Sequence, residues 1–288
     1  MEIAPLPRLL IEPAVRRALD EDLGTAGDIT SAAVIPPDHR SAVAMVARRD
    51  GVIAGLDCAA LACELVDPRI TVTRHVSDGT AVRAGTRIAS LAGPSRSLLT
   101  AERTALNFLC HLSGIASATA ALVHLVDGTG TRITCTRKTT PGLRALEKHA
   151  VLAGGGASHR HSLADAMLIK DNHIAIAGGI RPALERARAM AGHMVKVEIE
   201  VDTLAQLAEV LEIGADVVLL DNMDIATLRE AVAMVAGRAV TEASGTITPE
   251  TARAVAATGV DLISLGWITH SAPALDIGLD FLAAQDGA

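Results

Sequence analysis

Short apolar runs alternate with amphipathic segments through the second half of the chain. The runs are aliphatic or β-branched without polar alternation, which is typical of strands buried on both faces of a sheet. They cover residues 132–136, 166–169, 195–199, 217–220, 239–243 and 262–265. Amphipathic helices are predicted between most of them, at residues 182–191, 204–212, 225–235 and 249–257. The alternation indicates a parallel sheet of β-α-β units, and the number of repeats favours a barrel over a doubly wound sheet.

The first hundred residues show a different pattern. A helical spacing of apolar residues at 8–22 is followed by short alternating runs, and residues 78–85 are predicted to turn between two strands. The alternating runs lie at residues 42–47, 70–75 and 86–91. A second helical pattern covers residues 100–126. A small sheet-and-helix domain therefore precedes the predicted barrel.

These patterns give expected domain boundaries. Residues 1–108 form the N-terminal α/β domain, and residues 109–274 form the α/β barrel that carries the chemistry. A C-terminal helix at residues 275–288 is expected to join the N-terminal domain.

Composition narrows the class of protein. The net charge of −7 and the two Phe, one Trp and no Tyr exclude both the basic footprint and the aromatic platforms of nucleic-acid binding. The four cysteines form no C-x-x-C pair, and the chain begins with no signal-peptide pattern. No apolar run approaches the roughly 18 residues that span a bilayer. We therefore expect a cytoplasmic protein without membrane or nucleic-acid partners.

Polar residues follow each predicted barrel strand. Because the carboxyl ends of parallel barrel strands meet at one rim, these side chains are expected to line a single opening, where active sites form. The strand-end segments are Thr136-Arg137-Lys138, Lys170-Asp171-Asn172, Glu198-Ile199-Glu200, Asp221-Asn222, Glu242-Ala243-Ser244-Gly245 and Gly266.

The charges at this rim predict a small anionic ligand. Cationic side chains gather there in an acidic protein, which suits a multiply charged anion. They are Arg137, Lys138 and Lys170, joined by His159 and Arg160 from a glycine-rich segment that we expect to be flexible. Glu200 and Asp221 would repel each other unless they shared a cation, and Mg²⁺ suits carboxylate ligands.

A phosphate-binding loop is predicted after the fifth of these strands. Ser244-Gly245-Thr246 leads to Thr248-Pro249, which marks the start of a helix. A glycine-containing loop that enters a helix N-terminus is suited to bind phosphate, and late barrel strands commonly provide one.

At these residues the chain resembles the quinolinate phosphoribosyltransferase family (nicotinate-nucleotide pyrophosphorylase, carboxylating). The matching segments occur in the family's order over about residues 100–280. They include Glu102-Arg103-Thr104, Thr136-Arg137-Lys138-Thr139-Thr140-Pro141-Gly142, Glu147-Lys148-His149-Ala150, Gly154-Gly155-Gly156, His159-Arg160, Lys170-Asp171-Asn172-His173, Glu198-Ile199-Glu200-Val201-Asp202, Leu220-Asp221-Asn222, Ala243-Ser244-Gly245 and Leu275-Asp276-Ile277-Gly278.

The resemblance implies a fold and a reaction. The fold is the type II phosphoribosyltransferase fold, an N-terminal α/β sandwich beside an open, TIM-like α/β barrel, assembled as a homodimer. The reaction transfers phosphoribosyl from phosphoribosyl pyrophosphate to quinolinate with Mg²⁺. Its products are nicotinate mononucleotide, pyrophosphate and CO₂, a step of NAD biosynthesis.

The resemblance also implies residue roles. Lys138, Lys170, Glu200 and Asp221 are expected to be catalytic, and Glu200 and Asp221 to meet Mg²⁺ through phosphoribosyl pyrophosphate or water. Arg103 is expected to reach the partner subunit's site. Quinolinate would be bound by Arg103, Thr136, Arg137, Lys138, His159, Arg160 and Lys170. Phosphoribosyl pyrophosphate would be bound by Glu200, Asp221, Ser244, Gly245, Thr246, Leu265, Gly266, Trp267 and His270. Ser158, Thr246 and Trp267 depart from residues that are common in the family.

Three alternatives remain open on the sequence. Lys170 could form a Schiff base in a barrel lyase or aldolase. A related protein linked to molybdenum transport shares much of the pattern, although the Lys170–His173 segment favours the transferase. Nicotinate phosphoribosyltransferase shares the substrate chemistry, although Arg103 and the His159-Arg160 pair favour a ligand with two carboxylates.

Overall fold

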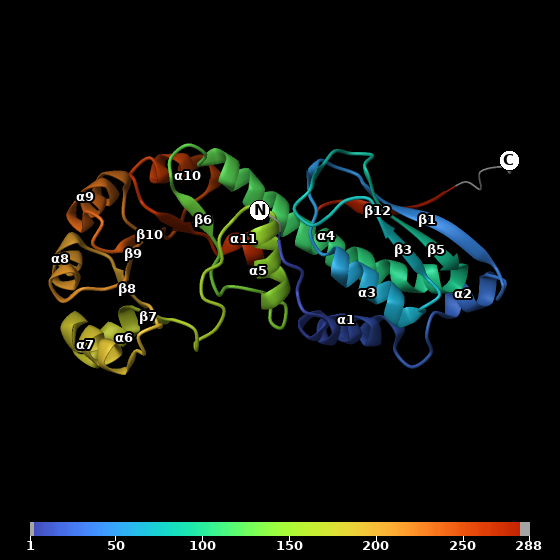
Figure 1. The fold of residues 1–288 in the computed structure, drawn as a ribbon, viewed down its shortest axis with the longest axis horizontal. Helices are drawn as coiled ribbons and strands as arrows, with labels where there is room; N and C mark the ends of the chain where they lie inside the picture. The colour runs from blue at the N-terminus through green and yellow to red at the C-terminus, as the bar shows by residue number, and fades with distance from the viewer. Residues whose placement is uncertain (1–2, 283–288) are drawn as a thin grey trace. The chain divides into compact units, whose positions relative to one another are not determined.

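The computed structural model describes residues 3–282, which form two compact units (Figure 1). Of these residues, the first unit comprises 3–120, 139–155 and 268–282, and the second comprises Ala121–Lys138 and Gly156–Trp267. Residues 139–155, which the sequence pattern placed in the barrel, therefore belong to the first unit.

The second unit is an open α/β barrel. Its six-stranded parallel sheet has the order β6-β11-β10-β9-β8-β7, so β6 and β7 are edge strands among residues 3–282. The strands are β6 (Arg132–Thr134), β7 (Met167–Ile169), β8 (Val197–Val201), β9 (Val217–Asp221), β10 (Val240–Ser244) and β11 (Leu262–Ser264). The helices are α6 (Asp171–Ala177), α7 (Ile180–Met190), α8 (Leu204–Ile213), α9 (Ile225–Val235) and α10 (Pro249–Ala256). This confirms the predicted parallel α/β architecture.

Aliphatic side chains hold this sheet together. Ile199, Val218 and Leu220 are fully buried, as expected for strands covered on both faces. Within the unit, the helices lie on the outer side of the curved sheet in Figure 1. Glu200 lies inside β8, whereas the sequence pattern ended that strand at residue 199.

Side-chain caps fix where helices begin after the rim loops. The Thr203 side chain accepts a hydrogen bond from the Gln206 N–H in a capping box, and the Asp224 carboxylate accepts one from the Thr227 N–H at 2.8 Å. Pro249 opens α10, as predicted from the sequence. Each cap fixes where its helix begins, and so where the loop after the preceding strand ends.

The first unit is an α/β sandwich. Its antiparallel sheet has the order β12-β1-β5-β3, and a separate pair joins β2 to β4. The strands are β1 (Arg40–Ala47), β2 (Gly51–Val52), β3 (Thr71–Arg74), β4 (Ala81–Val82), β5 (Arg87–Pro94) and β12 (Ile277–Phe281). The helices are α1 (Arg8–Leu23), α2 (Ile29–Val34), α3 (Leu56–Val66), α4 (Ser95–Leu125, whose last residues belong to the second unit), α5 (Arg144–Ala153) and α11 (Trp267–His270, shared between the units).

The C-terminal segment corrects the sequence prediction. Residues 277–281 form strand β12 rather than part of a helix, and β12 pairs antiparallel with β1. Apolar residues alternate there (Ile277, Leu279, Phe281), which is the two-residue period of a strand. The segment does return to the N-terminal sheet, and residues 283–288 of the expected helix lie outside the described part of the chain.

Helix α4 is long and contains an apolar window. Among the described residues, it is the one helix whose length and composition would let it cross a membrane. Half of its apolar window is buried within the protein, however, and the core helix of a soluble protein passes the same test. Leu106, Leu109 and Leu112 on this helix are buried.

Candidate functional site

The carboxyl ends of the parallel strands bring the predicted rim residues of the second unit to one edge of the sheet. Asp221 at the end of β9 is in register with Ser244 at the end of β10. Glu200 of β8 is in register with Leu219 of β9, so the two acidic residues come from neighbouring strands. The structure therefore places Glu200, Asp221 and Ser244 on three adjacent strands, near their carboxyl ends.

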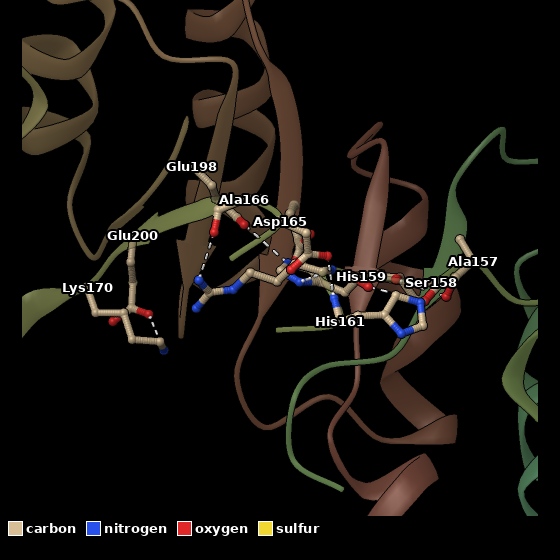
Figure 2. Close-up of polar contacts among 12 residues, drawn as sticks. Ala157, Ser158, His159, His161, Asp165, Ala166, Lys170, Glu198 and Glu200 are labelled. Atoms are coloured by element: carbon tan, nitrogen blue, oxygen red, sulfur yellow. Dashed lines mark hydrogen bonds and ion pairs between the residues drawn. The ribbon is translucent and has the colours of Figure 1, made fainter. Parts of the chain in front are cut away.

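Lys170 and Glu200 form an ion pair at this rim. The Lys170 Nζ lies 2.9 Å from the Glu200 Oε2, and Figure 2 shows the two side chains facing each other. The lysine side chain is 49% exposed, whereas the glutamate is 12% exposed. The ion pair requires the ammonium form of Lys170, which disfavours a Schiff-base role because that needs a neutral amine.

Asp221 lies on the strand next to that of Glu200, and the two residues together are called the acidic corner. Burial, followed by the negative charges of Glu200 and Asp202, raises the pKa of the Asp221 carboxyl, and a hydrogen bond with Ser244 opposes the rise. Carboxylates that disfavour each other's ionisation suit a shared cation. Glu200 and Asp221 therefore fit the expected Mg²⁺ chemistry.

Gly245 occupies a backbone position that a larger residue would not tolerate. Its φ is +122°, and an added Cβ would lie 2.4 Å from the Asn222 Oδ1. The Asn222 N–H donates to the Ser244 carbonyl at 3.1 Å, and Asn222 itself has a left-handed φ of 52°. No role for Asn222 was predicted from the sequence, but it shapes the loop that continues through exposed Thr246.

Arg137 and Arg160 form the cationic part of the rim. Burial lowers the pKa of the Arg160 guanidinium, and the positive charge of Arg137 lowers it further. The Arg160 Nη1 donates to the Ala166 carbonyl at 3.1 Å. The Thr136 hydroxyl accepts a hydrogen bond from the Lys138 N–H at 3.0 Å, which orders the turn after β6. Two half-buried guanidinium groups in proximity suit a ligand with more than one negative charge.

His159 lies against two buried carboxylates to which the sequence pattern assigned no role. Its Nε2 is 3.2 Å from the Glu198 Oε2 and 3.5 Å from the Glu242 Oε1. Burial, followed by the charge of Glu198, raises the pKa of Glu242 to about 7. The two-residue period of a strand could have revealed both residues. Glu198 lies on the same strand face as Glu200, and Glu242 on the same face as Ser244, so each faces the same way as a predicted site residue.

The remaining predicted residues fall into two groups. Leu265, Gly266 and Trp267 follow β11 in the second unit, and the Leu265 N–H donates to the Thr134 carbonyl. Arg103 and His270 belong to the first unit, where both are exposed. Roles for Arg103 and His270 stay predictions.

Comparison with known proteins decides the family. Residues 28–113 match the family model of the quinolinate phosphoribosyl transferase N-terminal domain, and residues 115–280 match that of the C-terminal domain. The chain belongs to the quinolinate phosphoribosyltransferase family. The two matches meet near residue 114, within helix α4.

Relatives of this quinolinate phosphoribosyltransferase family member align along nearly its whole length. A Bacillus subtilis protein named probable nicotinate-nucleotide pyrophosphorylase (carboxylating) is 45% identical over 266 residues, which cover 92% of this chain and 91% of the relative. The Mycobacterium leprae nicotinate-nucleotide pyrophosphorylase (carboxylating) is 45% identical over 271 residues, with 92% and 95% covered. The solved Francisella tularensis nicotinate-nucleotide pyrophosphorylase has a TM-score of 0.93 at 39% identity, covering 98% of this chain and 99% of that one.

Proposed function

We propose that this chain transfers phosphoribosyl from phosphoribosyl pyrophosphate to quinolinate and releases CO₂. The relatives bear the names of enzymes of this reaction. The observation that carries the proposal is the pairing, at one sheet edge, of a cationic cluster with the Glu200–Asp221 acidic corner. Such a rim suits a dicarboxylate acceptor next to a metal-bound sugar pyrophosphate.

The acceptor is held by cations. In this proposal Arg137, Arg160 and Lys138 bind the two quinolinate carboxylates, with Thr136 ordering the turn and His159 supporting Arg160. The exposed ammonium of Lys170 contacts a carboxylate while Glu200 keeps it in place. These contacts orient the pyridine nitrogen towards the sugar, and positioning of this kind lowers the barrier substantially.

The donor is held by the acidic corner and the loop after β10. Ser244, Gly245 and Thr246 contact phosphate, together with Leu265, Gly266 and Trp267. Glu200 and Asp221 would hold Mg²⁺ and the ribose hydroxyls. When bound, Mg²⁺ would neutralise negative charge on the departing pyrophosphate.

Bond changes then follow in order. The C1–O bond to pyrophosphate breaks, and the Glu200 and Asp221 carboxylates stabilise the positive charge that develops on the ribose. The quinolinate nitrogen forms the new bond to C1. The resulting pyridinium accepts the electron pair when the bond to the 2-carboxylate breaks, CO₂ leaves, and a solvent proton adds to C2. On this route no side chain acts as a covalent nucleophile.

A homodimer in the cytoplasm completes the proposal. Exposed apolar residues on α1 and α2 (Leu9, Leu10, Ile29 and Val34) support a protein interface on the first unit. Arg103, exposed on α4, is proposed to enter the partner subunit's site. The structure joins none of the four cysteines in a disulfide, and three of them are buried, which suits a reducing compartment.

The direct test is product formation. Purified protein is mixed with quinolinate, phosphoribosyl pyrophosphate and Mg²⁺, and nicotinate mononucleotide is sought by chromatography. The proposal predicts product that depends on all three additions and disappears when a chelator removes Mg²⁺. Product formation that persists in the chelator would remove the metal from the proposal.

A further inference from the structure

Two carboxylates are buried beneath the cationic rim of the second unit. Glu198 is 6% exposed and Glu242 is 2% exposed, and they come from β8 and β10, which flank β9 in the sheet. Within the described residues, the Glu198 Oε1 and the Glu242 Oε1 are both buried without a hydrogen-bond partner. Burial of a carboxylate is unfavourable unless it is paired. The two buried carboxylates therefore need a partner that offsets the cost of their burial. The His159 Nε2 lies close to both.

The backbone fixes which nitrogen of His159 carries a proton. The Arg160 N–H donates to the His159 Nδ1 at 2.8 Å, and a backbone N–H can only donate. The Nδ1 must therefore be the acceptor, so the proton of the neutral ring lies on Nε2. The Nε2 that carries this proton lies 3.2 Å from the Glu198 Oε2, within hydrogen-bond distance, and 3.5 Å from the Glu242 Oε1, where the interaction is one of charge and proximity.

The same tautomer disfavours metal binding by this cluster. The ligand atoms of His159, Glu198 and Glu242 lie within 4.8 Å of one another, a spacing that could hold a metal ion. A metal on Nε2 would require the ring proton on Nδ1, which already accepts from Arg160. The geometry therefore favours a hydrogen-bonded cluster.

We propose that Glu198 and Glu242 are positioning residues, which hold His159 through its Nε2–H and thereby fix the turn that carries Arg160. The chain of contacts runs from the two strands to the imidazole, from its Nδ1 to the Arg160 backbone, and from the Arg160 side chain to the Ala166 carbonyl. Figure 2 shows His159 and the Ala166 carbonyl on this segment. The inference rests on the proposed function, because it assigns the carboxylates to acceptor binding.

The tautomer is measured without any substrate. The protein is labelled with ¹⁵N-histidine, long-range ¹H–¹⁵N correlations are recorded at pH 7, and His159→Gln identifies the signal of interest. We expect the Nε2–H tautomer with Nδ1 as an acceptor. A proton on Nδ1 would overturn the inference, as would perturbation of this signal by stoichiometric Zn²⁺ that reports coordination through Nε2.

Kinetics test the link to the acceptor. In Glu198→Gln/Glu242→Gln, the KM for quinolinate should rise about tenfold, as expected for a weakened charge-assisted hydrogen bond, while the KM for phosphoribosyl pyrophosphate changes less than about twofold. Exposed Glu230→Gln on α9 is the matched control and should change neither. Adding His159→Gln to the double variant should give the same KM as His159→Gln alone, because the three groups act as one unit.

The outcomes separate the two proposals. Independent, additive effects of the carboxylate and histidine changes, or equal increases in both KM values, would contradict positioning through His159. If wild-type protein formed no nicotinate mononucleotide, the proposed function would fail, while the tautomer measurement would still decide the geometry of the cluster.

Discussion

The Lys170 ammonium is held by the Glu200 carboxylate at 2.9 Å, across the ends of neighbouring strands. The glutamate is largely buried and the lysine is half exposed, so one side of the ammonium is fixed and the other is open to solvent. This asymmetry distinguishes the pair from a surface salt bridge, which typically contributes little to stability. The ion pair therefore holds the Lys170 ammonium in one orientation at the sheet edge, where the proposed acceptor would bind.

Replacing Lys170 should weaken acceptor binding specifically. Lys170→Ala removes a charge-assisted contact, so the KM for quinolinate should rise by roughly ten- to a hundredfold. Lys196→Ala is the control, because Lys196 forms an exposed ion pair with Asp216 elsewhere on the unit. Initial rates at varied quinolinate measure both. An unchanged KM in Lys170→Ala would contradict the assignment.

Gly245 should be required for donor binding. Gly245→Ala forces a Cβ against Asn222 at a positive φ, so the loop must shift, and strain of this kind predicts a KM for phosphoribosyl pyrophosphate about tenfold higher. Gly192→Ala is the matched control, since nothing lies within 4 Å of a Cβ added there. Similar kinetics in the two variants would show that the loop does not bind the donor.

Glu242 should make stability depend on pH. An unfolded Glu ionises near its ordinary pKa of 4.5, whereas Glu242 in the fold ionises with a pKa of about 7. Between these values unfolding releases a proton, so the Glu242 contribution is fully present below pH 4.5 and is lost as the pH rises to about 7. Thermal midpoints of wild type and Glu242→Gln, recorded from about pH 5 to about pH 7.5, measure the difference. The wild-type midpoint should fall relative to the variant, and parallel profiles would contradict the shift.

Mixing two impaired variants, assayed at quinolinate concentrations too low for either alone to turn over appreciably, tests the proposed role of Arg103. In a heterodimer of Arg103→Ala and Lys170→Ala, one site would combine intact Lys170 with the intact Arg103 of the other subunit. Random reassociation gives half heterodimers with one good site each, so about a quarter of wild-type activity should return. Each variant reassociated alone is the control. Absence of recovery, with heterodimers shown by native mass spectrometry, would place Arg103 in its own subunit's chemistry.

The rim was predictable because parallel strands impose it. Uninterrupted apolar runs located the strands, and their carboxyl ends had to meet, so the strand order alone grouped Lys170, Glu200 and Asp221. Strand β12 was missed because five residues, one of them a glycine, give a weak two-residue period. Its strand state depends on pairing with β1, some 230 residues away in the chain, which no local pattern records.

The buried part of the site was harder to predict. Glu198 and Glu242 were visible as charges inside apolar strands, but only the fold brings the two strands and His159 together. The glycine-rich segment before His159 was expected to be flexible. Instead Gly154 is packed so closely against α4 that an added Cβ would lie 2.4 Å from the Ala116 carbonyl. Close approach, rather than freedom, explains that glycine.

The most direct measurement follows the carboxylate that leaves. Quinolinate labelled with ¹³C in the 2-carboxylate is incubated with the protein, phosphoribosyl pyrophosphate and Mg²⁺, with nicotinate as a parallel acceptor. The account predicts one labelled CO₂ for each nicotinate mononucleotide formed and no comparable product from nicotinate. Nicotinate mononucleotide formed from nicotinate at a similar rate, or without labelled CO₂ from quinolinate, would contradict it.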